Sequence, residues 1–299
     1  MKRLIPAALF ALLLLGCSKP EQRSFAPADR EFAMNMVRLQ CEIVPRHSGT
    51  PGAEKTAELI LKTAQSMKGV AARIDTFTEN TPTGEITFRN VICELPGQGK
   101  PVIIGAHYDA KKLKLAPNFQ AANDGGSGVA VLLTVMKTLS SQEKPLPFPV
   151  HFIFFDGEEC QFEYGPSDGL HGSRKAAEDY AGKARAMILA DMVGDDNWNI
   201  ALPENCSPEL KKIIIQAAKE LNLQNQVEQS TMQVLDDHVP FFESGIPAVN
   251  LIDFDYGPYN AYWHTAYDKI DKIDPESLGK TADLILKTLA IMEKESFGN

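Results

Sequence analysis

Short apolar runs alternate along this chain with longer segments whose apolar residues recur at helical spacing. The runs are rich in Val and Ile and are bounded by turn residues, a pattern typical of strands buried on both faces. They cover residues 90–95, 101–109, 148–156, 184–193 and 246–252. The helical patterns cover residues 53–67, 127–141, 173–182, 207–221 and 275–293. This alternation predicts an α/β fold: a three-layer sandwich in which a central, mostly parallel (mixed) sheet lies between helices on both faces.

Titratable residues gather where these strands are expected to end. In such sheets the ligand site forms at the carboxyl ends of the strands. The residues concerned are His107, Asp109, Asp124, Asp156, Glu158, Glu159, Asp191 and His264. Some have purely structural interpretations, since Asp124 could cap the following helix, Asp156 could form a turn, and His107 could be a satisfied buried histidine. A lone carboxylate inside an apolar strand, as at Asp191, is costly without a cation or donors.

Taken together, these acids predict a metal. They would place uncompensated negative charge in one cleft, and a bound divalent cation is the simplest compensation. Histidine nitrogen combined with carboxylate oxygen favours zinc, which keeps an open coordination position in catalytic sites. The adjacent Glu158 and Glu159 could divide the work, one as a ligand and the other as a proton carrier. Their spacing alone does not decide which glutamate has which role.

The composition is that of a globular protein. The chain has 299 residues, of which 44% are hydrophobic and 23% charged, and this excludes disordered and fibrous classes. Its formal net charge of -9 argues against a nucleic-acid partner, because such proteins usually present a basic face. From residue 28 onward there is no linker or repeat, so residues 28–299 are predicted to form a single catalytic domain.

The first seventeen residues are typical of an export signal. Lys2 and Arg3 precede a short apolar core that ends in a Leu-Leu-Gly-Cys sequence at Cys17. This resembles a bacterial lipoprotein signal, which implies cleavage, lipid attachment at Cys17 and a membrane-anchored periplasmic protein of the cell envelope. The pattern does not indicate which membrane holds the anchor, and an ordinary signal peptide with an incidental cysteine is the alternative. Residues 18–27 are predicted to be a polar tether.

The other cysteines are Cys41, Cys93, Cys160 and Cys206. Their wide spacing contains no Cys-x-x-Cys metal pattern and fixes no disulfide pairing. We therefore expect core residues, with one disulfide possible in an oxidising compartment.

A family resemblance rests on a series of motifs in order along the chain. They occupy residues 105–110, 121–130, 154–159, 171–174, 188–194, 237–252 and 263–274. In this pattern the chain resembles the zinc-dependent aminopeptidase superfamily and, within it, the glutaminyl cyclases. The resemblance covers nearly all of the chain after the tether. It implies an acyltransferase that converts the N-terminal glutamine of peptides to pyroglutamate and releases ammonia.

The resemblance also implies roles for individual residues. Asp124, Glu159 and His264 are the implied ligands of one zinc ion per chain, and Glu158 is the implied general acid and base. His107 and Asp191 match positions that bind a second zinc in the two-metal peptidases. In the cyclases these two positions persist without a second metal, and Asp191 joins a hydrogen-bond network.

Several features favour a cyclase over a peptidase. An insertion, residues 160–168, separates the glutamate pair from Gly169-Leu170, and the later motifs have Asp236-Asp237 and Trp263-His264. Of the aspartate pair, Asp236 is the expected functional member, because Asp237 could cap a short helix at 238–243. Within the insertion Tyr164 replaces a tryptophan of animal cyclases, and Tyr164 and Trp263 are expected to wall the substrate pocket, unless they are simple core aromatics.

Three functions therefore stay open. The first is the cyclase. The second is a zinc aminopeptidase of the same superfamily, and the glycine-rich loop around Asp124 is nearer to the peptidase form. The third is a periplasmic binding lipoprotein without catalysis, which the intact Glu158-Glu159 pair disfavours.

Overall fold

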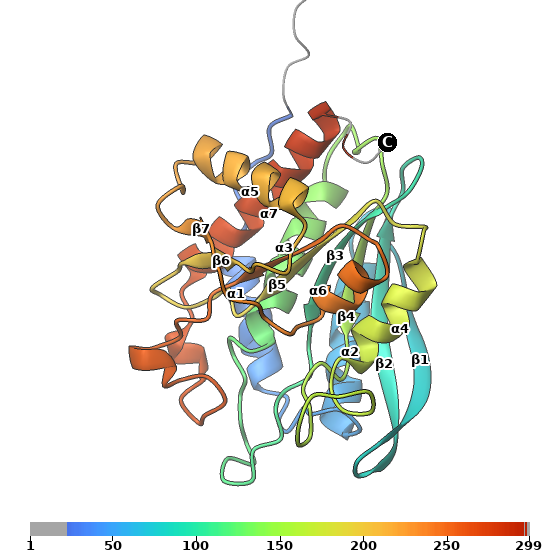
Figure 1. Ribbon diagram of the computed structural model, residues 1–299, viewed down its shortest axis with the longest axis vertical. Coiled ribbons are helices and arrows are strands. Elements are labelled where there is room, and N and C mark those ends of the chain that lie inside the picture. Colours follow the sequence, from blue (N-terminus) through green and yellow to red (C-terminus); the bar gives the residue numbers. More distant parts are fainter. Residues whose placement is uncertain (1–22, 296, 298–299) are drawn as a thin grey trace, which may run out of the picture.

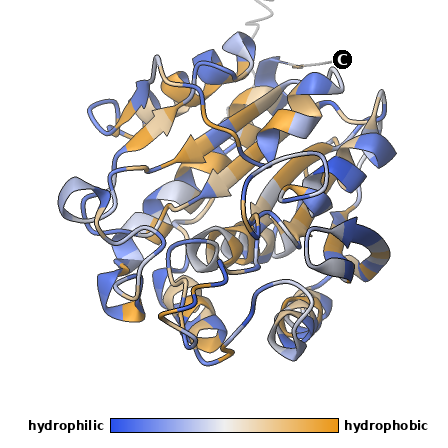
Figure 2. Ribbon diagram, turned by 60° about the horizontal axis from the view of Figure 1, so that its bottom comes forward, coloured by the Kyte–Doolittle hydropathy of each residue, from blue (hydrophilic) through white to orange (hydrophobic). Residues whose placement is uncertain are grey.

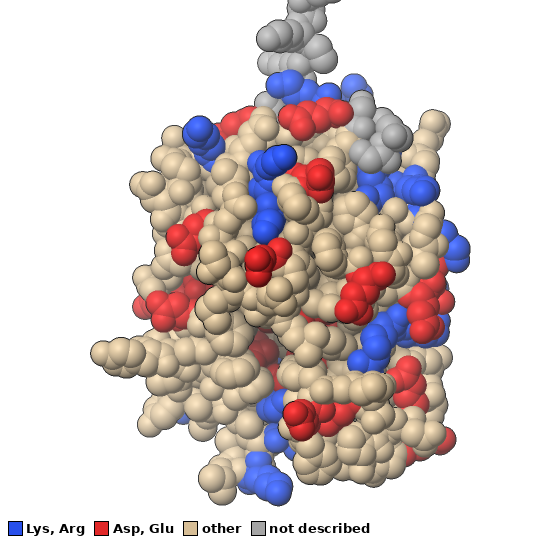
Figure 3. Space-filling view, in the orientation of Figure 1, with Lys and Arg blue, Asp and Glu red and all other residues tan. Residues whose placement is uncertain are grey.

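The structure, a computed structural model, describes residues 23–295 and residue 297. The predicted signal segment with Cys17 and the first part of the predicted tether therefore lie outside the described residues. Within this range the structure contains no helix with the length and apolar character needed to cross a membrane. On the face drawn in Figure 3, Lys and Arg alternate with Asp and Glu in small groups.

One eight-stranded sheet runs through the molecule (Figure 1). The strands are β1 (Ala71–Thr81), β2 (Gly84–Leu95), β3 (Val102–His107), β4 (Val150–Phe155), β5 (Ala186–Asp191), β6 (Ile200–Leu202), β7 (Val227–Gln229) and β8 (Ala248–Ile252). Their order across the sheet is β1-β2-β4-β3-β5-β8-β6-β7. The four central strands, β4, β3, β5 and β8, are mutually parallel, whereas β2 and β6 join them antiparallel. The predicted mixed sheet with a parallel centre is confirmed.

Helices cover both faces of the sheet. They are α1 (Arg30–Cys41), α2 (Pro51–Gln65), α3 (Gly126–Ser140), α4 (His171–Tyr180), α5 (Pro208–Glu220), α6 (His238–Glu243) and α7 (Pro275–Glu295), with short 3-10 helices η1 (Pro258–Asn260) and η2 (Ile270–Lys272). The larger core packs α1, α2, α3, α5 and α7 against one face, and a smaller core packs α4 and α6 against the other. Figure 2 shows strands coloured mainly as hydrophobic between helices in which hydrophobic and hydrophilic residues alternate.

Helix α3 lies deepest, and nearly all of its residues are buried. Its close approach to the sheet requires glycine: a Cβ atom on Gly128 would lie 2.2 Å from the carbonyl oxygen of Ala190 in β5. Because α3 follows directly on the loop that carries Asp124, its tight packing fixes the position of that loop.

The sequence did not predict three strands near the edges of the sheet or the first helix. Strand β1 alternates between exposed and partly buried residues, so it lacks the continuous apolar run of a central strand. Strands β6 and β7 are only three residues long. Helix α1 was also missed, although its start is marked by Asp29, whose side chain accepts a hydrogen bond from the Phe32 N–H.

The cysteines are buried and free. Cys41, Cys93, Cys160 and Cys206 all lie in the interior, and none of these four forms a disulfide. Their expected role as core residues is confirmed, and the disulfide considered from the sequence does not form.

The last residues of the predicted tether lie against the domain. The Arg23 guanidinium contacts Glu293 at 2.6 Å and donates to the carbonyl oxygens of Lys144 and Pro145. The Ala28 N–H donates to Asp283 in the same helix, α7. These contacts hold the segment from Arg23 to Ala28 beside helix α7.

Candidate metal centre and substrate cleft

Three predicted metal ligands meet at the carboxyl edge of the sheet. Asp124 comes from the loop before α3, Glu159 from the turn after β4, and His264 from the segment after β8, and one ligand atom of each lies within 4.8 Å of the others. The Nε2 atom of His264 is 3.0 Å from Glu159 Oε1 and 3.2 Å from Asp124 Oδ2. A single ring nitrogen has only one proton to donate, and Asp124 Oδ2 is buried without a hydrogen-bond partner. The donor set therefore fits a shared cation.

A second cluster adjoins the first. The Nε2 atom of His107 lies 3.2 Å from Asp124 Oδ1 and 3.2 Å from Asp191 Oδ1. These three side chains also satisfy the distances of a metal site, and Asp124 belongs to both groups. The two clusters together have the shape of a two-metal centre with a bridging carboxylate.

Two further carboxylates hold the loops that carry the ligands. Asp109 accepts hydrogen bonds from the backbone N–H groups of Glu158 and Glu159, at 3.1 and 3.2 Å. Asp268 accepts from the N–H groups of Asn123 and Asp124, at 2.8 and 3.1 Å. The side chains of Asp109 and Asp268 thus fix the backbone of the two ligand loops. The ligand side chains of these loops stay free to face the cleft.

The structure also tests the purely structural roles that the sequence allowed for Asp124 and Asp156. Asp124 does not cap α3, because the N-cap position belongs to Gly125 and no side chain caps that helix. Asp156 accepts hydrogen bonds from the Ser48 hydroxyl at 2.6 Å and from the Arg89 N–H at 2.9 Å, so it links neighbouring segments instead of facing the ligands.

Glu158 lies beside the metal cluster in a buried position. The Tyr164 hydroxyl donates to its carboxylate, at 3.0 Å from Oε1 and 3.2 Å from Oε2. Burial raises the pKa of Glu158 well above its usual range; His107 opposes this shift, while Glu159 and Asp236 add to it. A carboxyl group in this setting can hold a proton near neutral pH and release it to a neighbour.

Asp191 and Asp236 line the same cavity as Glu158. Within the described range neither forms a direct hydrogen bond to Glu158, and Asp191 is instead paired with His107, whose Nε2 lies 3.2 Å from Asp191 Oδ1. Asp236 is held by the Asn250 amide at 2.7 Å and by the Asp237 N–H at 2.6 Å, and burial raises its pKa well above the usual range. Asp237 occupies the N-cap position of α6, but its side chain makes no capping hydrogen bond, which corrects the capping interpretation of that residue.

The cavity has a volume of about 420 Å³ and is acidic on one side and apolar on the other. Trp263 and Tyr164 both line it, and Trp263 stacks on the His264 ring with centroids 4.2 Å apart. Phe254, which packs against Trp263 at 5.0 Å, continues the wall. The remaining apolar lining comes from Ala201, Pro203, Met232, Val234, Leu235 and Ile252. A small uncharged side chain with a polar end fits this combination.

The insertion at residues 160–168 builds one wall of the cleft. Its backbone is organised by Asp168, whose carboxylate accepts hydrogen bonds from the N–H groups of Gln161, Phe162 and Glu163 at 2.5, 2.9 and 3.1 Å. This compact loop positions Tyr164 over Glu158.

Sequence reasoning missed Lys111 as a member of the site. Its Nζ atom lies 3.2 Å from Glu159 Oε2, 3.1 Å from Cys160 Sγ and 5.6 Å from the centre of the Tyr164 ring. Lys111 lies four positions after the end of strand β3, and this position was the sequence feature that could have indicated a site residue. The ammonium group partly neutralises the acids and helps to fix Glu159.

Comparison with known proteins identifies the family. The model of peptidase family M28 matches residues 90–289, about two thirds of the chain. This chain belongs to peptidase family M28. The match includes every residue of both metal-type clusters, and the family is metal-dependent.

Several of the similar proteins are glutaminyl cyclases by name. A solved glutaminyl cyclase from an Acidobacteriales bacterium is 32% identical, with a TM-score of 0.83 over 93% of this chain and 99% of that one. The Porphyromonas gingivalis glutaminyl cyclase is 27% identical, with a TM-score of 0.80 over 88% and 98% of the two chains. The glutaminyl-peptide cyclotransferase-like protein of Mus musculus is 28% identical over 83% of this chain and 72% of its own length. The predicted resemblance and the enzymatic nature of this M28 member are confirmed.

The first prediction concerns cation binding. Asp124→Asn and His264→Gln should each lower the affinity for a divalent cation at least 10-fold, because each removes one of three direct ligands. Equilibrium dialysis against Zn²⁺, Co²⁺ and Mn²⁺ measures this change. Glu243→Gln, which removes a distant exposed acid, is the matched control. Equal cation affinity in Asp124→Asn and the unaltered protein would contradict the assignment.

Proposed function

We propose that this M28 member is a glutaminyl cyclase, which converts the N-terminal glutamine of peptides and proteins to pyroglutamate with release of ammonia. The observation that carries the proposal is the cleft itself: a ligand trio and a buried Glu158 face apolar walls that include Tyr164 of the insertion. The solved cyclases that match over nearly the whole chain support the same activity.

The chemistry follows from where protons must move. The N-terminal nitrogen of the substrate forms a bond to the side-chain amide carbon, and the bond from that carbon to the amide nitrogen breaks. Glu158 takes a proton from the attacking amine and gives one to the leaving nitrogen, which departs as ammonia. Its raised pKa suits both steps, and the Tyr164 hydroxyl orients its carboxylate.

Asp124, Glu159 and His264 would hold the metal ion, and we propose one zinc ion per chain. When bound, zinc supplies Lewis-acid polarisation of the side-chain amide carbonyl. Asp236 adds to the raised pKa of Glu158 and so favours its protonated form between the two transfers, while Asp191 lies in the same cavity with its Oδ1 3.2 Å from His107 Nε2. Trp263, Phe254 and Tyr164 exclude water from the reacting amide.

A specific observation favours a second candidate, the aminopeptidase. His107 and Asp191 complete a second ligand cluster of the kind that two-metal hydrolases use, and Asp124 bridges both. In that case Glu158 would activate a water molecule instead of a substrate amine. The insertion argues for the cyclase, since Tyr164 narrows the cleft beside Glu158.

The deciding experiment compares two peptides that differ only in their first residue. The proposal expects a Gln-initiated peptide to lose the mass of ammonia, and a Leu-initiated peptide to stay intact, as followed by mass spectrometry. Release of free Leu would instead identify an aminopeptidase. Glu158→Gln is the matched variant: it keeps the shape and should lower kcat by about 10²- to 10⁴-fold, the range typical of a lost general base, without loss of metal.

A separate prediction concerns the Tyr164 hydroxyl. Tyr164→Phe removes only the donor to Glu158 and should lower kcat about 5- to 30-fold, equivalent to about 1–2 kcal/mol, while KM changes less than twofold. Tyr164→Leu also removes the aromatic wall and should raise KM as well. Steady-state kinetics on a Gln-initiated peptide separates the two effects, and an unchanged kcat in Tyr164→Phe would show that the hydroxyl does not orient the base.

We also propose that the protein is a periplasmic lipoprotein of the bacterial cell envelope, anchored through Cys17. The support is the sequence pattern that ends at Cys17. Cys17→Ala should move the protein from the membrane fraction to the soluble periplasmic fraction and abolish incorporation of labelled palmitate. Unchanged fractionation of this variant would argue for another means of retention.

A further inference from the structure

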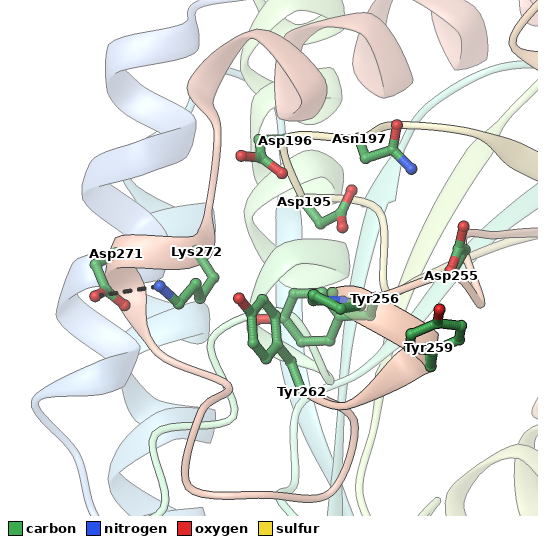
Figure 4. A pocket seen from close by; sticks show the side chains of 11 residues that line it. Asp195, Asp196, Asn197, Asp255, Tyr256, Tyr259, Tyr262, Asp271 and Lys272 are labelled. Atoms are coloured by element: carbon green, nitrogen blue, oxygen red, sulfur yellow. Dashed lines mark ion pairs between the residues drawn. The ribbon is translucent and has the colours of Figure 1, made fainter.

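A second cavity lies beside the substrate cleft and has no part in the chemistry above. Its volume is about 620 Å³, and the loops after β5 and β8 and the η2 turn enclose it. Figure 4 shows Asp195, Asp196, Asp255 and Asp271 arranged around the rings of Tyr256 and Tyr262.

The cavity carries an excess of negative charge. Lys272 is the one cation in its lining, and its nearest carboxylate, Asp271, is 3.6 Å away on the outer side. Asp195 is only 3% exposed, and its Oδ1 atom has no hydrogen-bond partner among the described residues. Burial and the neighbouring Asp196 raise the pKa of Asp195 to about 6. An unpaired buried acceptor is costly, so the site favours a ligand that brings a positively charged donor.

The geometry favours an organic cation over a metal ion. Within the described residues, no three carboxylates of this cavity come within 4.8 Å of one another, as a preformed metal site requires. The volume exceeds that of a single ion. One wall is aromatic, and the Lys272 ammonium already lies 5.4 Å from the centre of the Tyr262 ring. That ring therefore faces a cationic side chain in the protein itself, in the manner of a cation–π contact.

One chain segment separates this cavity from the substrate cleft. Phe254 and Trp263 line the cleft, whereas their neighbours Asp255 and Tyr262 line the acidic cavity. An extended peptide advances about 3.3 Å per residue, so a side chain two to four positions after the first lies roughly 7–13 Å further along. A peptide that leaves the cleft over this segment brings those side chains to the acidic cavity.

We propose that this cavity is a subsite for a lysine or arginine side chain that follows the N-terminal glutamine of the substrate by a few positions. Asp195 and Asp255 would receive the charged group, and Tyr262 would contact its stem. This inference rests on the proposed cyclase activity, and it adds a preference for basic peptides that the metal centre cannot supply.

The test scans one arginine through positions two to six of a Gln-initiated alanine peptide and uses citrulline, which is uncharged and of similar shape, as the reference. KM should fall about 3- to 10-fold for arginine at one or two adjacent positions. A protein of net charge -9 attracts any basic peptide, but such a general field would act at every position alike. Equal KM values for both residues, or a gain independent of position, would overturn the proposal.

Variants of the cavity residues test whether the lower KM for arginine peptides depends on this cavity. Asp255→Asn and Asp196→Asn alter exposed residues, and each should shrink the arginine advantage at least twofold; Asp195→Asn tests the buried acceptor. Glu243→Gln changes the charge equally, outside the cavity, and should leave the advantage intact. Fluorescence anisotropy of labelled arginine and citrulline peptides measures binding without turnover. If no peptide is cyclised, the proposed cyclase function is wrong. If the arginine and citrulline peptides bind equally well, only the proposed subsite is wrong.

Discussion

Mutual repulsion among buried carboxylates is the constraint around which this structure is arranged. Asp124, Glu159 and Asp191 reach one edge of the sheet because the parallel strands β3, β4, β5 and β8 all end there. Such a cluster is stable only if each acid has a fixed partner or shares a cation. His264 and Lys111 lie 3.0 and 3.2 Å from Glu159, and His107 lies 3.2 Å from Asp191, while Asp109 and Asp268 hold the backbone of the two ligand loops. The fold topology therefore concentrates the charges, and backbone hydrogen bonds to Asp109 and Asp268 hold the loops that carry them.

The centre of the sheet was predictable because its strands are buried on both faces, which gives continuous apolar runs. The same logic explains what was missed: β1 alternates as an edge strand, and β6 and β7 are too short to form a pattern. The layered arrangement followed from the alternation of strands and helices. Antiparallel pairing at β2 and β6 could not follow, because it depends on contacts between distant segments.

The sequence predicted the main acids and histidines of the candidate site but not the residues around them. Its titratable residues stand at strand ends, so their convergence followed from the fold class, and the family motifs pointed to the ligand trio. Lys111, Phe254 and Asn250 were not anticipated, because each acts as a single residue without a repeating pattern. The bond from the Tyr164 hydroxyl to Glu158 likewise depends on how the insertion turns back over the cleft, a property of its folded shape.

That insertion satisfies much of its own backbone. Asp168 binds three N–H groups within residues 161–163, and Gly165 pairs with Asp168 across the loop. Because these polar groups are satisfied internally, the rest of the domain need not change when the loop does. The wall that Tyr164 contributes to the cleft and the sheet edge that carries the acids are thus structurally separable parts of the protein. Selectivity can diverge between relatives while the acids and the strands beneath them stay the same.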